Sequence, residues 1–387
     1  MSLVLEEKQY ENHFKFNSST NAEDTIDLTN LNWLETLDFL YIHLEYLHDH
    51  TPFVWLCAKI TFITLFFIYV AIPVFVKANQ WIMPRIIFLN IVRWPPFTDL
   101  TKPHDFGLNN TRNFYLNTQE GVKIGVWHVL PVSVQSDSNN IPWDKFEDEL
   151  SNGKMVFLYL HGNSGTRGSY HRVQLYKILA QLDFHVIAID YRGYGDSTGH
   201  PTENGVVFDS YTIYKWLKSR VGDSKIFLWG HSLGTGVTAK LAKLLCEEED
   251  HPAGIVLEAP FNNIRDAAFH HPFSAPYRSL PYFEYVFVDP LKEHGLFFNS
   301  EENLASVIPH IMILHAEDDL IVPFHLGEKL YAKAKESRGH DKVQFVSFEA
   351  SLGYGHKLIY KAPQLPSLIR EFVAKSNLRL RNTSYRY

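Results

Sequence analysis

An apolar segment at residues 53–77 constrains the fold of this chain more than any other feature. Its length is about what a tilted helix needs to cross the hydrocarbon core of a bilayer. Trp55 and Trp81 lie near its two ends, where amphipathic rings favour the membrane interface. Lys59 is close enough to the start for its ammonium group to reach the head groups. The segment therefore predicts a transmembrane helix at 53–77, and a buried helix of a soluble domain is the alternative.

This segment separates two populations of charge. The chain of 387 residues carries a formal net charge of −7. Residues 1–50 contain ten acidic and two basic side chains, a net of −8, so the remaining 337 residues sum to +1. We therefore expect an acidic N-terminal tail at 1–52 and a nearly neutral remainder, which argues against a nucleic-acid partner because nucleic-acid binders normally present a basic face. The two cysteines, Cys57 and Cys246, are too few for a disulfide-based scaffold.

The stretch that follows, 78–112, is expected to be a juxtamembrane segment. Between Trp81 and Phe97 it mixes large apolar residues with two arginines and three prolines, a pattern too broken to span a bilayer. Such a segment either lies in the membrane interface or packs on the domain that follows, and the sequence leaves both possibilities open.

From residue 113 the pattern changes to short β-rich runs separated by segments of helical length. The predicted strands are 113–118, 122–129, 155–160, 185–190, 225–229, 254–258, 310–315 and 343–348, and the predicted helices are 169–182, 204–220, 233–247, 325–336 and 363–375. The central strands are continuously apolar, as expected for strands that are covered on both faces. The pattern predicts an α/β fold at 113–376, with a mostly parallel, doubly wound sheet and an antiparallel entrance formed by the first two strands. A C-terminal tail is expected at 377–387.

One stretch, 261–309, interrupts this alternation. It is too long for a simple crossover and too rich in phenylalanine and tyrosine for a solvated loop. We interpret it as a cap inserted over a pocket, and an extra packing layer on the core is the alternative.

The sharpest chemical signal is Gly230-His231-Ser232-Leu233-Gly234, which directly follows the predicted strand 225–229 and opens a helical segment. Small residues at these positions allow a turn from strand to helix so tight that the serine side chain stands exposed. The motif predicts Ser232 as a nucleophile, and a glycine-rich helix-packing turn is the alternative.

A serine nucleophile needs a general base, and that base needs an orienting carboxylate. In α/β hydrolases these two residues follow the serine in the order acid, then histidine. Three adjacent acids at 317–319 follow the predicted strand 310–315, and His356 follows the strand 343–348 after a glycine-rich loop. Chain position therefore selects His356 as the base among the 20 histidines.

The transition state of acyl transfer places negative charge on the former carbonyl oxygen, which two preorganised N–H donors can bind. The loop His161-Gly162-Asn163-Ser164-Gly165-Thr166 directly follows the strand 155–160. We expect the amides of Asn163 and Leu233 to form this oxyanion hole. A phosphate-binding loop is the alternative, but the loop lacks the Lys-Ser/Thr ending and the G-x-G-x-x-G pattern.

Neither a metal nor a cofactor is predicted. The histidine pairs at 48–50 and 270–271 lack a second half with ligand spacing. Acyl-enzyme chemistry at a serine uses only the nucleophile, its base and water.

Several segments together resemble one known family. They are 124–128 (Ile-Gly-Val-Trp-His), 161–168 (His-Gly-Asn-Ser-Gly-Thr-Arg-Gly), 230–236 (Gly-His-Ser-Leu-Gly-Thr-Gly), 315–319 (His-Ala-Glu-Asp-Asp) and 352–357 (Leu-Gly-Tyr-Gly-His-Lys). They are similar to the membrane-bound α/β-hydrolase-domain lipases, which include lysophosphatidylserine lipase and monoacylglycerol lipase. The resemblance extends from about Trp81 to Phe372 and does not include the acidic tail.

This resemblance implies an α/β-hydrolase fold and a serine hydrolase that cleaves the acyl ester of lysophospholipids, lysophosphatidylserine in particular, and of monoacylglycerols. It assigns the nucleophile to Ser232 and the base to His356. The acid turn of the family places its aspartate shortly before a Val-Pro pair, which favours Asp319, and Asp318 is the alternative. An acyl-protein thioesterase or peptidase with the same triad, or a non-catalytic membrane scaffold, would be the rival functions. No protein partner is indicated.

The resemblance also implies a single-pass protein of the endoplasmic reticulum membrane with a lumenal catalytic domain. The glycosylation sequons at Asn109 and Asn382 favour the lumen. By contrast, Lys77, Arg85 and Arg93 follow the apolar segment, and the positive-inside rule would place that side in the cytosol. We expect the lumenal orientation.

Overall fold

The computed structural model describes residues 51–383, apart from 94–95, 119–120, 136–142 and 340, together with residues 37, 38, 40, 41 and 44. Most of the predicted acidic tail, 1–52, and the end of the predicted C-terminal tail, 384–387, lie outside these residues. The chain divides into two units, Met1–Ala71 and Ile72–Tyr387.

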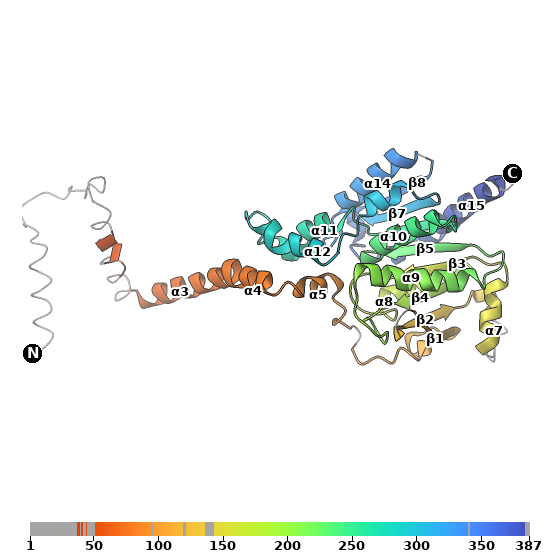
Figure 1. Cartoon of the computed structure of the whole chain (residues 1–387), viewed down its shortest axis with the longest axis horizontal. Helices are drawn as coiled ribbons and strands as arrows, with labels where there is room; N and C mark the ends of the chain where they lie inside the picture. The colour runs from red at the N-terminus through yellow and green to blue at the C-terminus, as the bar shows by residue number, and fades with distance from the viewer. Residues whose placement is uncertain are drawn as a thin grey trace, which may run out of the picture. The chain divides into compact units, whose positions relative to one another are not determined.

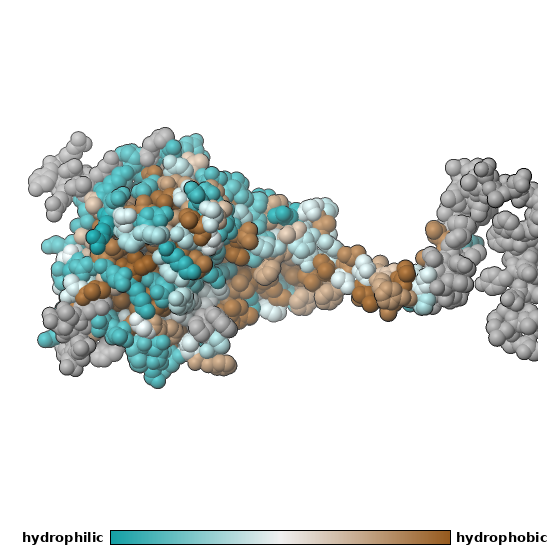
Figure 2. Space-filling view, turned by 180° about the vertical axis from the view of Figure 1, so that it is seen from behind, coloured by the Kyte–Doolittle hydropathy of each residue, from teal (hydrophilic) through white to brown (hydrophobic). Residues whose placement is uncertain are grey.

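The apolar segment forms one helix of 27 residues, Pro52–Ala78. It consists of α3 (Pro52–Phe66), the π-helical turn η2 (Phe67–Ala71) and α4 (Ile72–Ala78). No residue of α3 or η2 is buried, and Figure 2 shows much of this helix in the brown of hydrophobic residues. Among the described residues it is the one helix long and apolar enough to cross a membrane, which fits a single-pass membrane protein.

Eight strands form a single sheet, and the predicted strands are confirmed to within two residues at each end. The strands are β1 (Thr111–Asn117), β2 (Lys123–Val129), β3 (Val156–Leu160), β4 (His185–Asp190), β5 (Ile226–His231), β6 (Gly254–Glu258), β7 (His310–Ala316) and β8 (Val343–Phe348). Their order in the sheet is β1-β2-β4-β3-β5-β6-β7-β8. The strand β2 is antiparallel to both β1 and β4, and all other pairs are parallel. The predicted doubly wound sheet with an antiparallel entrance is therefore confirmed.

Helices cover both faces of this sheet (Figure 1). One face carries α8 (Tyr170–Gln181) and α15 (Leu365–Thr383), and the other carries α9 (Glu203–Lys218), α10 (Leu233–Glu247) and α14 (Phe324–Arg338). Along β5, Phe227 and Trp229 belong to one core while Ile226 and Leu228 belong to the other. Because alternate side chains of a strand point to opposite faces, a sheet buried on both sides needs continuously apolar strands.

The helix α15 extends to Thr383, so the predicted domain end at 376 falls inside a helix. Phe372 and Val373 of α15 are buried in the core between this helix and the sheet.

The predicted cap, 261–309, folds into short helices: α11 (Ile264–His270), η6 (Pro272–Ser274), η7 (Glu284–Val288), α12 (Asp289–Glu293) and α13 (Ser300–Ala305). Its C-terminal part is tied to the core by Glu203, whose Oε2 accepts hydrogen bonds from the amides of Phe297 (2.6 Å) and Phe298 (2.8 Å). Lys77 of α4 donates to the backbone oxygen of Tyr285 in η7 at 3.1 Å. The segment is thus both a packing layer on α10 and a neighbour of α4.

The predicted juxtamembrane segment, 78–112, contains α5 (Ile82–Phe88) and η3 (Pro103–Phe106), and its last residues already belong to β1. Phe88 is fully buried, and the backbone oxygen of Leu100 accepts a hydrogen bond from the indole of Trp127 at 2.8 Å. These contacts match the packing alternative. The remaining short helices are α6 (Val132–Gln135), α7 (Trp143–Asp148), η5 (Glu149–Ser151), η8 (Ala350–Leu352) and η9 (Ile359–Lys361).

Candidate active site

Ser232 lies in a strained turn between β5 and α10. Its backbone has φ +54° and ψ −122°, a conformation that non-glycine residues seldom adopt. The flanking glycines allow the turn to be this tight. A Cβ at Gly230 would lie 2.4 Å from the hydroxyl oxygen of Thr238, and a Cβ at Gly234 would lie 2.0 Å from the backbone oxygen of Leu160. The turn therefore leaves the Ser232 side chain at the carboxyl end of the sheet.

The structure brings together three of the predicted residues from distant parts of the chain. The Oγ of Ser232 lies 2.9 Å from the Nε2 of His356, a contact between residues 124 positions apart. The Nδ1 of His356 lies 2.7 Å from the Oδ2 of Asp319. In this arrangement the hydroxyl donates to Nε2 and the Nδ1–H donates to the carboxylate, which is the geometry required for a base that activates a serine.

The side chain of Asp319 is fully buried, and several hydrogen bonds stabilise its charge. Its Oδ1 accepts hydrogen bonds from the amides of Ile321 and Val322, both at 2.9 Å. Burial raises the pKa of Asp319, but hydrogen bonds from His315 and His356 lower it by more, so the pKa lies below its usual range. Asp319 is therefore ionised at neutral pH and able to stabilise a protonated His356.

Asp318, the alternative acid, has a different partner. Its Oδ1 accepts a hydrogen bond from the amide of Gly355 at 2.9 Å. The imidazole of His356 thus contacts Asp319, while Asp318 contacts the main chain one residue before that histidine.

The predicted oxyanion loop lies against the serine turn. A Cβ at Gly162 would lie 3.1 Å from the Cβ of Ser232, which shows how closely the two segments approach. Leu233 is the first residue of α10, so its amide has no acceptor within the helix. The loop is held in place by Arg172, which donates to the backbone oxygens of Ser164 (2.6 Å) and Thr166 (2.7 Å). This role of Arg172 could not be predicted from residue types, because its partners are main-chain atoms.

The amide of Gly165, in the same loop, donates to the backbone oxygen of Val92 at 2.9 Å. The juxtamembrane segment therefore contacts the loop that is expected to hold the oxyanion. Tyr194 adds a second link, because its hydroxyl donates to the backbone oxygen of Phe88 and lies 3.3 Å from that of Asn163.

A buried network of charged side chains lies at the end of the oxyanion loop, at Arg167. Arg167 is fully buried and donates to Asp190 and Asp196, both at 2.6 Å, and to Asn113 at 2.8 Å. Both terminal nitrogens of its guanidinium thus bind protein groups, whereas its Nε has no hydrogen-bond partner among the described residues.

The histidine pairs and the sequon asparagines that the sequence contains do not belong to the triad. Within the described ranges no group of three or more histidine, cysteine, aspartate or glutamate side chains could hold a metal ion, and residues 48–50 lie outside those ranges. Asn109 is exposed in the turn before β1. Asn382 lies near the end of α15, and its side chain is outside the described part of the structure.

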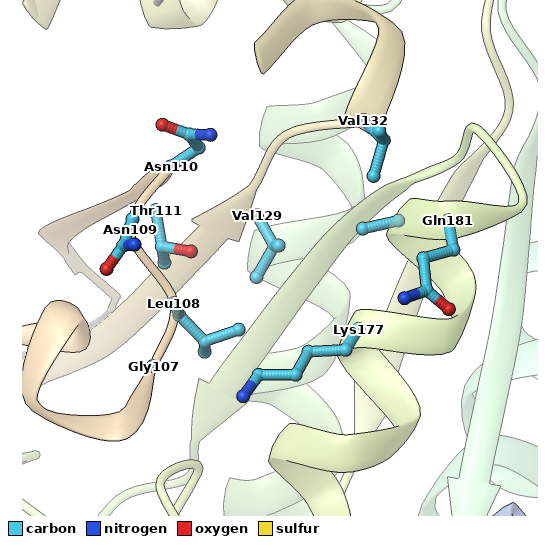
Figure 3. A pocket seen from close by; sticks show the side chains of 10 residues that line it. Gly107, Leu108, Asn109, Asn110, Thr111, Val129, Val132, Lys177 and Gln181 are labelled. Carbon is cyan, nitrogen blue, oxygen red and sulfur yellow. The ribbon is translucent and has the colours of Figure 1, made fainter. Parts of the chain in front are cut away.

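A cavity of about 340 Å³ lies between the turn before β1 and the C-terminal part of α8. Figure 3 shows residues that line it, among them Asn109, Thr111, Val129 and Lys177. None of its lining residues belongs to the triad or to the oxyanion loop, so this cavity is separate from the chemistry described above.

Comparison with known proteins agrees with this architecture. Residues 156–288 match the family described as alpha/beta hydrolase fold. The crystal structure of an alpha-beta hydrolase from Vibrio vulnificus is similar with a TM-score of 0.56 at 17% identity, covering 77% of this chain and 93% of that one. At this identity the likeness shows the fold alone.

Similarity in sequence extends over most of the chain. Lysophosphatidylserine lipase ABHD12 of Gallus gallus is 48% identical over 321 residues, which cover 82% of this chain and 84% of that protein. Protein ABHD12B of Homo sapiens is 38% identical over 295 residues, covering 76% of this chain and 81% of that protein. The chain therefore belongs to the α/β-hydrolase family that includes these ABHD12 and ABHD12B proteins, and it is a hydrolase.

Proposed function

We propose that this chain is a membrane-anchored serine hydrolase that cleaves the acyl ester of lysophosphatidylserine, of related lysophospholipids and of monoacylglycerols. The observation that carries the proposal is the continuous set of contacts from the Ser232 hydroxyl through His356 to Asp319, at 2.9 and 2.7 Å. The substrate class is supported by the name of the ABHD12 relatives, lysophosphatidylserine lipase, at 48% identity.

A lipid substrate is also supported by apolar side chains exposed beside each part of the site. Leu320 directly follows Asp319 and is 79% exposed, and Leu352 lies in the loop before His356 and is 46% exposed. Val92, whose carbonyl binds the oxyanion loop, is 48% exposed. Large exposed apolar side chains grouped around a site favour an apolar ligand or a membrane surface. With the apolar helix at 52–78, they favour a single-chain lipid that reaches the site from the bilayer.

The proposed reaction follows from the geometry. His356 takes the proton of the Ser232 hydroxyl as its oxygen attacks the ester carbonyl, and Asp319 stabilises the resulting imidazolium. The amides of Asn163 and Leu233 bind the oxygen on which negative charge develops. His356 then protonates the leaving glycerol oxygen, and water activated by the same histidine releases the fatty acid from Ser232. These steps use no cofactor.

A fluorophosphonate probe tests the nucleophile. The full-length chain in detergent micelles is expected to be labelled, Ser232→Ala is expected to lose the label, and the exposed Ser219→Ala is the matched control. Release of fatty acid from lysophosphatidylserine and monoolein is then compared with cleavage of a palmitoyl-thioester peptide. Preference for the thioester would overturn the proposed substrate, and a folded wild type that is not labelled would favour a non-catalytic scaffold.

We further propose the endoplasmic reticulum membrane as the location, with the catalytic domain in the lumen. The exposed position of Asn109, in an Asn-Asn-Thr sequon, supports this orientation. Endoglycosidase treatment of the protein from microsomes is expected to shift its mobility, and the shift should disappear in the double variant Asn109→Gln/Asn382→Gln. A wild-type protein without any shift would contradict the lumenal orientation.

A further inference from the structure

The loop that carries His356 closes on itself by one main-chain hydrogen bond around that residue, from the amide of Leu358 to the backbone oxygen of Tyr354 at 2.9 Å. Gly353 and Gly355 both have left-handed backbone, with φ +64° and +46°, and neither has a side chain to pack. Tyr354 between them is 9% exposed, with its ring 5.7 Å from the ring of Phe348. This contact anchors Tyr354, two residues before His356, and groups from elsewhere in the fold bind the main chain of the loop as well.

One such group is His231, the residue before Ser232. Its Nε2 lies 2.8 Å from the backbone oxygen of His356, and the ring centroids of the two histidines are 5.0 Å apart. His231 is 2% exposed, and burial lowers its pKa well below the usual range, so it is neutral. Because Nε2 faces a carbonyl oxygen, the single ring proton resides there and is donated to His356.

The surroundings of His231 are shaped for this contact. A Cβ at Gly162 would lie 3.2 Å from the Nδ1 of His231, so a glycine at this position leaves room for the ring. The Nδ1 itself has no hydrogen-bond partner within the part of the chain that the structure describes. Among the described residues, the ring of His231 thus makes its hydrogen bond to the backbone oxygen of His356 and to no other group.

The second group is Asp318, the residue before Asp319. Its carboxylate accepts the amide hydrogen of Gly355 at 2.9 Å. A hydrogen bond to an ionised carboxylate is shorter and stronger than one between neutral groups. The main chain of the loop is therefore hydrogen-bonded from outside at two points, the backbone oxygen of His356 and the amide of Gly355.

We propose that His231 and Asp318 are positioning residues that clamp the main chain of His356 for catalysis. Each residue of this clamp directly precedes a member of the triad, so the clamp ties the loop of the base both to the serine turn and to the acid turn. The hydrogen bond between Ser232 and His356 breaks and re-forms in every turnover. The clamp contacts only main-chain atoms, which take no part in proton transfer, and it can hold the imidazole in register throughout the cycle. The proposal rests on the serine hydrolase function proposed above.

The test compares variants that remove the hydrogen bond with variants that keep it. His231→Leu and Asp318→Ala lose the contact, whereas His231→Gln and Asp318→Asn retain an amide donor or an oxygen acceptor in a similar place. In the full-length protein in detergent micelles, the first pair is expected to lower kcat for monoolein by about 10- to 100-fold, because a displacement of about 1 Å at the reacting groups has an effect of this size. The KM should stay within about twofold, because the clamp does not contact the lipid. The second pair should recover most of kcat.

Glu317→Ala is the matched control, since this exposed acid lies in the same turn and its carboxylate accepts from the amide of Ala350, six residues before His356, at 3.3 Å rather than from Gly355. If His231→Leu does not fold, His231→Asn provides the second variant, because its shorter amide does not reach the His356 oxygen. The clamp is overturned if the first pair keeps kcat within about threefold of wild type, or if the conservative pair loses as much as the first. Activity that persists in Ser232→Ala would instead refute the proposed function, so the two failures are distinguishable.

Discussion

The substitution Gly234→Ala tests whether the serine turn depends on direct contact between α10 and β3. The Cβ of an alanine would lie 2.0 Å from the backbone oxygen of Leu160 and 2.7 Å from its carbonyl carbon. Cβ contacts below 3.0 Å are essentially never observed, so the two backbones must separate by at least about 1 Å. Both contacts involve main-chain atoms, which cannot rotate away as a flexible side chain would.

This displacement acts on the site directly, because Gly234 is two residues from Ser232 and one from the Leu233 amide. A shift of about 1 Å at reacting groups costs about 100-fold in rate, or about 3 kcal/mol of activation free energy. The overpacked contact should also lower the free energy of unfolding by about 1–3 kcal/mol. We therefore expect Gly234→Ala to lower kcat more than its loss of stability explains.

The assay measures kcat for monoolein and the Tm of the full-length protein in detergent micelles. Gly153→Ala is the control, because Gly153 has φ +85° with nothing within 4 Å of its Cβ position, so alanine there adds only backbone strain. This control should lose some stability and keep its kcat. If Gly234→Ala keeps kcat within about threefold of the wild type at an unchanged Tm, the contact between α10 and β3 does not set the position of the nucleophile.

Three further predictions concern charged groups near the site. Asp319→Asn should lower kcat by about 10⁴-fold, because an amide cannot stabilise the imidazolium form of His356. If Asp318→Asn showed a loss of that size and Asp319→Asn did not, Asp318 would be the acid of the triad. Burial raises the pKa of Glu258 to about 7 from 4.5. A raised carboxyl pKa favours folding at low pH, and this contribution to stability is lost as pH rises towards 7. At pH 8 the Glu258→Gln variant should therefore have a higher Tm than the wild type, and its free energy of unfolding should be higher by up to about 3 kcal/mol. An equal gain at pH 5 would contradict this cause. Arg167→Met should destabilise the fold by about 3–5 kcal/mol, because it leaves Asp190 buried without its partner; a Tm within 2 °C of wild type would show that the network is not required.

The secondary structure could be predicted well because its causes are local. Strands such as β4 and β5 are short apolar runs bounded by polar or glycine residues, and a sheet covered on both faces requires that pattern. The end of α15 could not be predicted in the same way. The apolar pattern predicts a helix that ends at 375, whereas the backbone of α15 continues to Thr383.

The aromatic segment at 261–309 shows a different limit. Its composition indicated burial, but a run of aromatic residues does not say which surface it covers. The structure packs part of it on α10, through Phe298 against Gly236, and part beside α4, through Tyr285 against Lys77. These partners lie far away in the sequence, so no local pattern could identify them.

The sequence by itself determined the parts of this protein that depend on neighbours along the chain. These are the apolar helix, the order of strands and helices, and the turn in which glycines flank Ser232. The residue types alone left three adjacent acids open and the family resemblance favoured Asp319; the tertiary structure directs Asp319 to the imidazole of His356 and Asp318 to the amide of Gly355. The physical reason is that a hydrogen bond requires a distance and an orientation. For residues 37 and 124 positions apart, the packing of the whole sheet sets both.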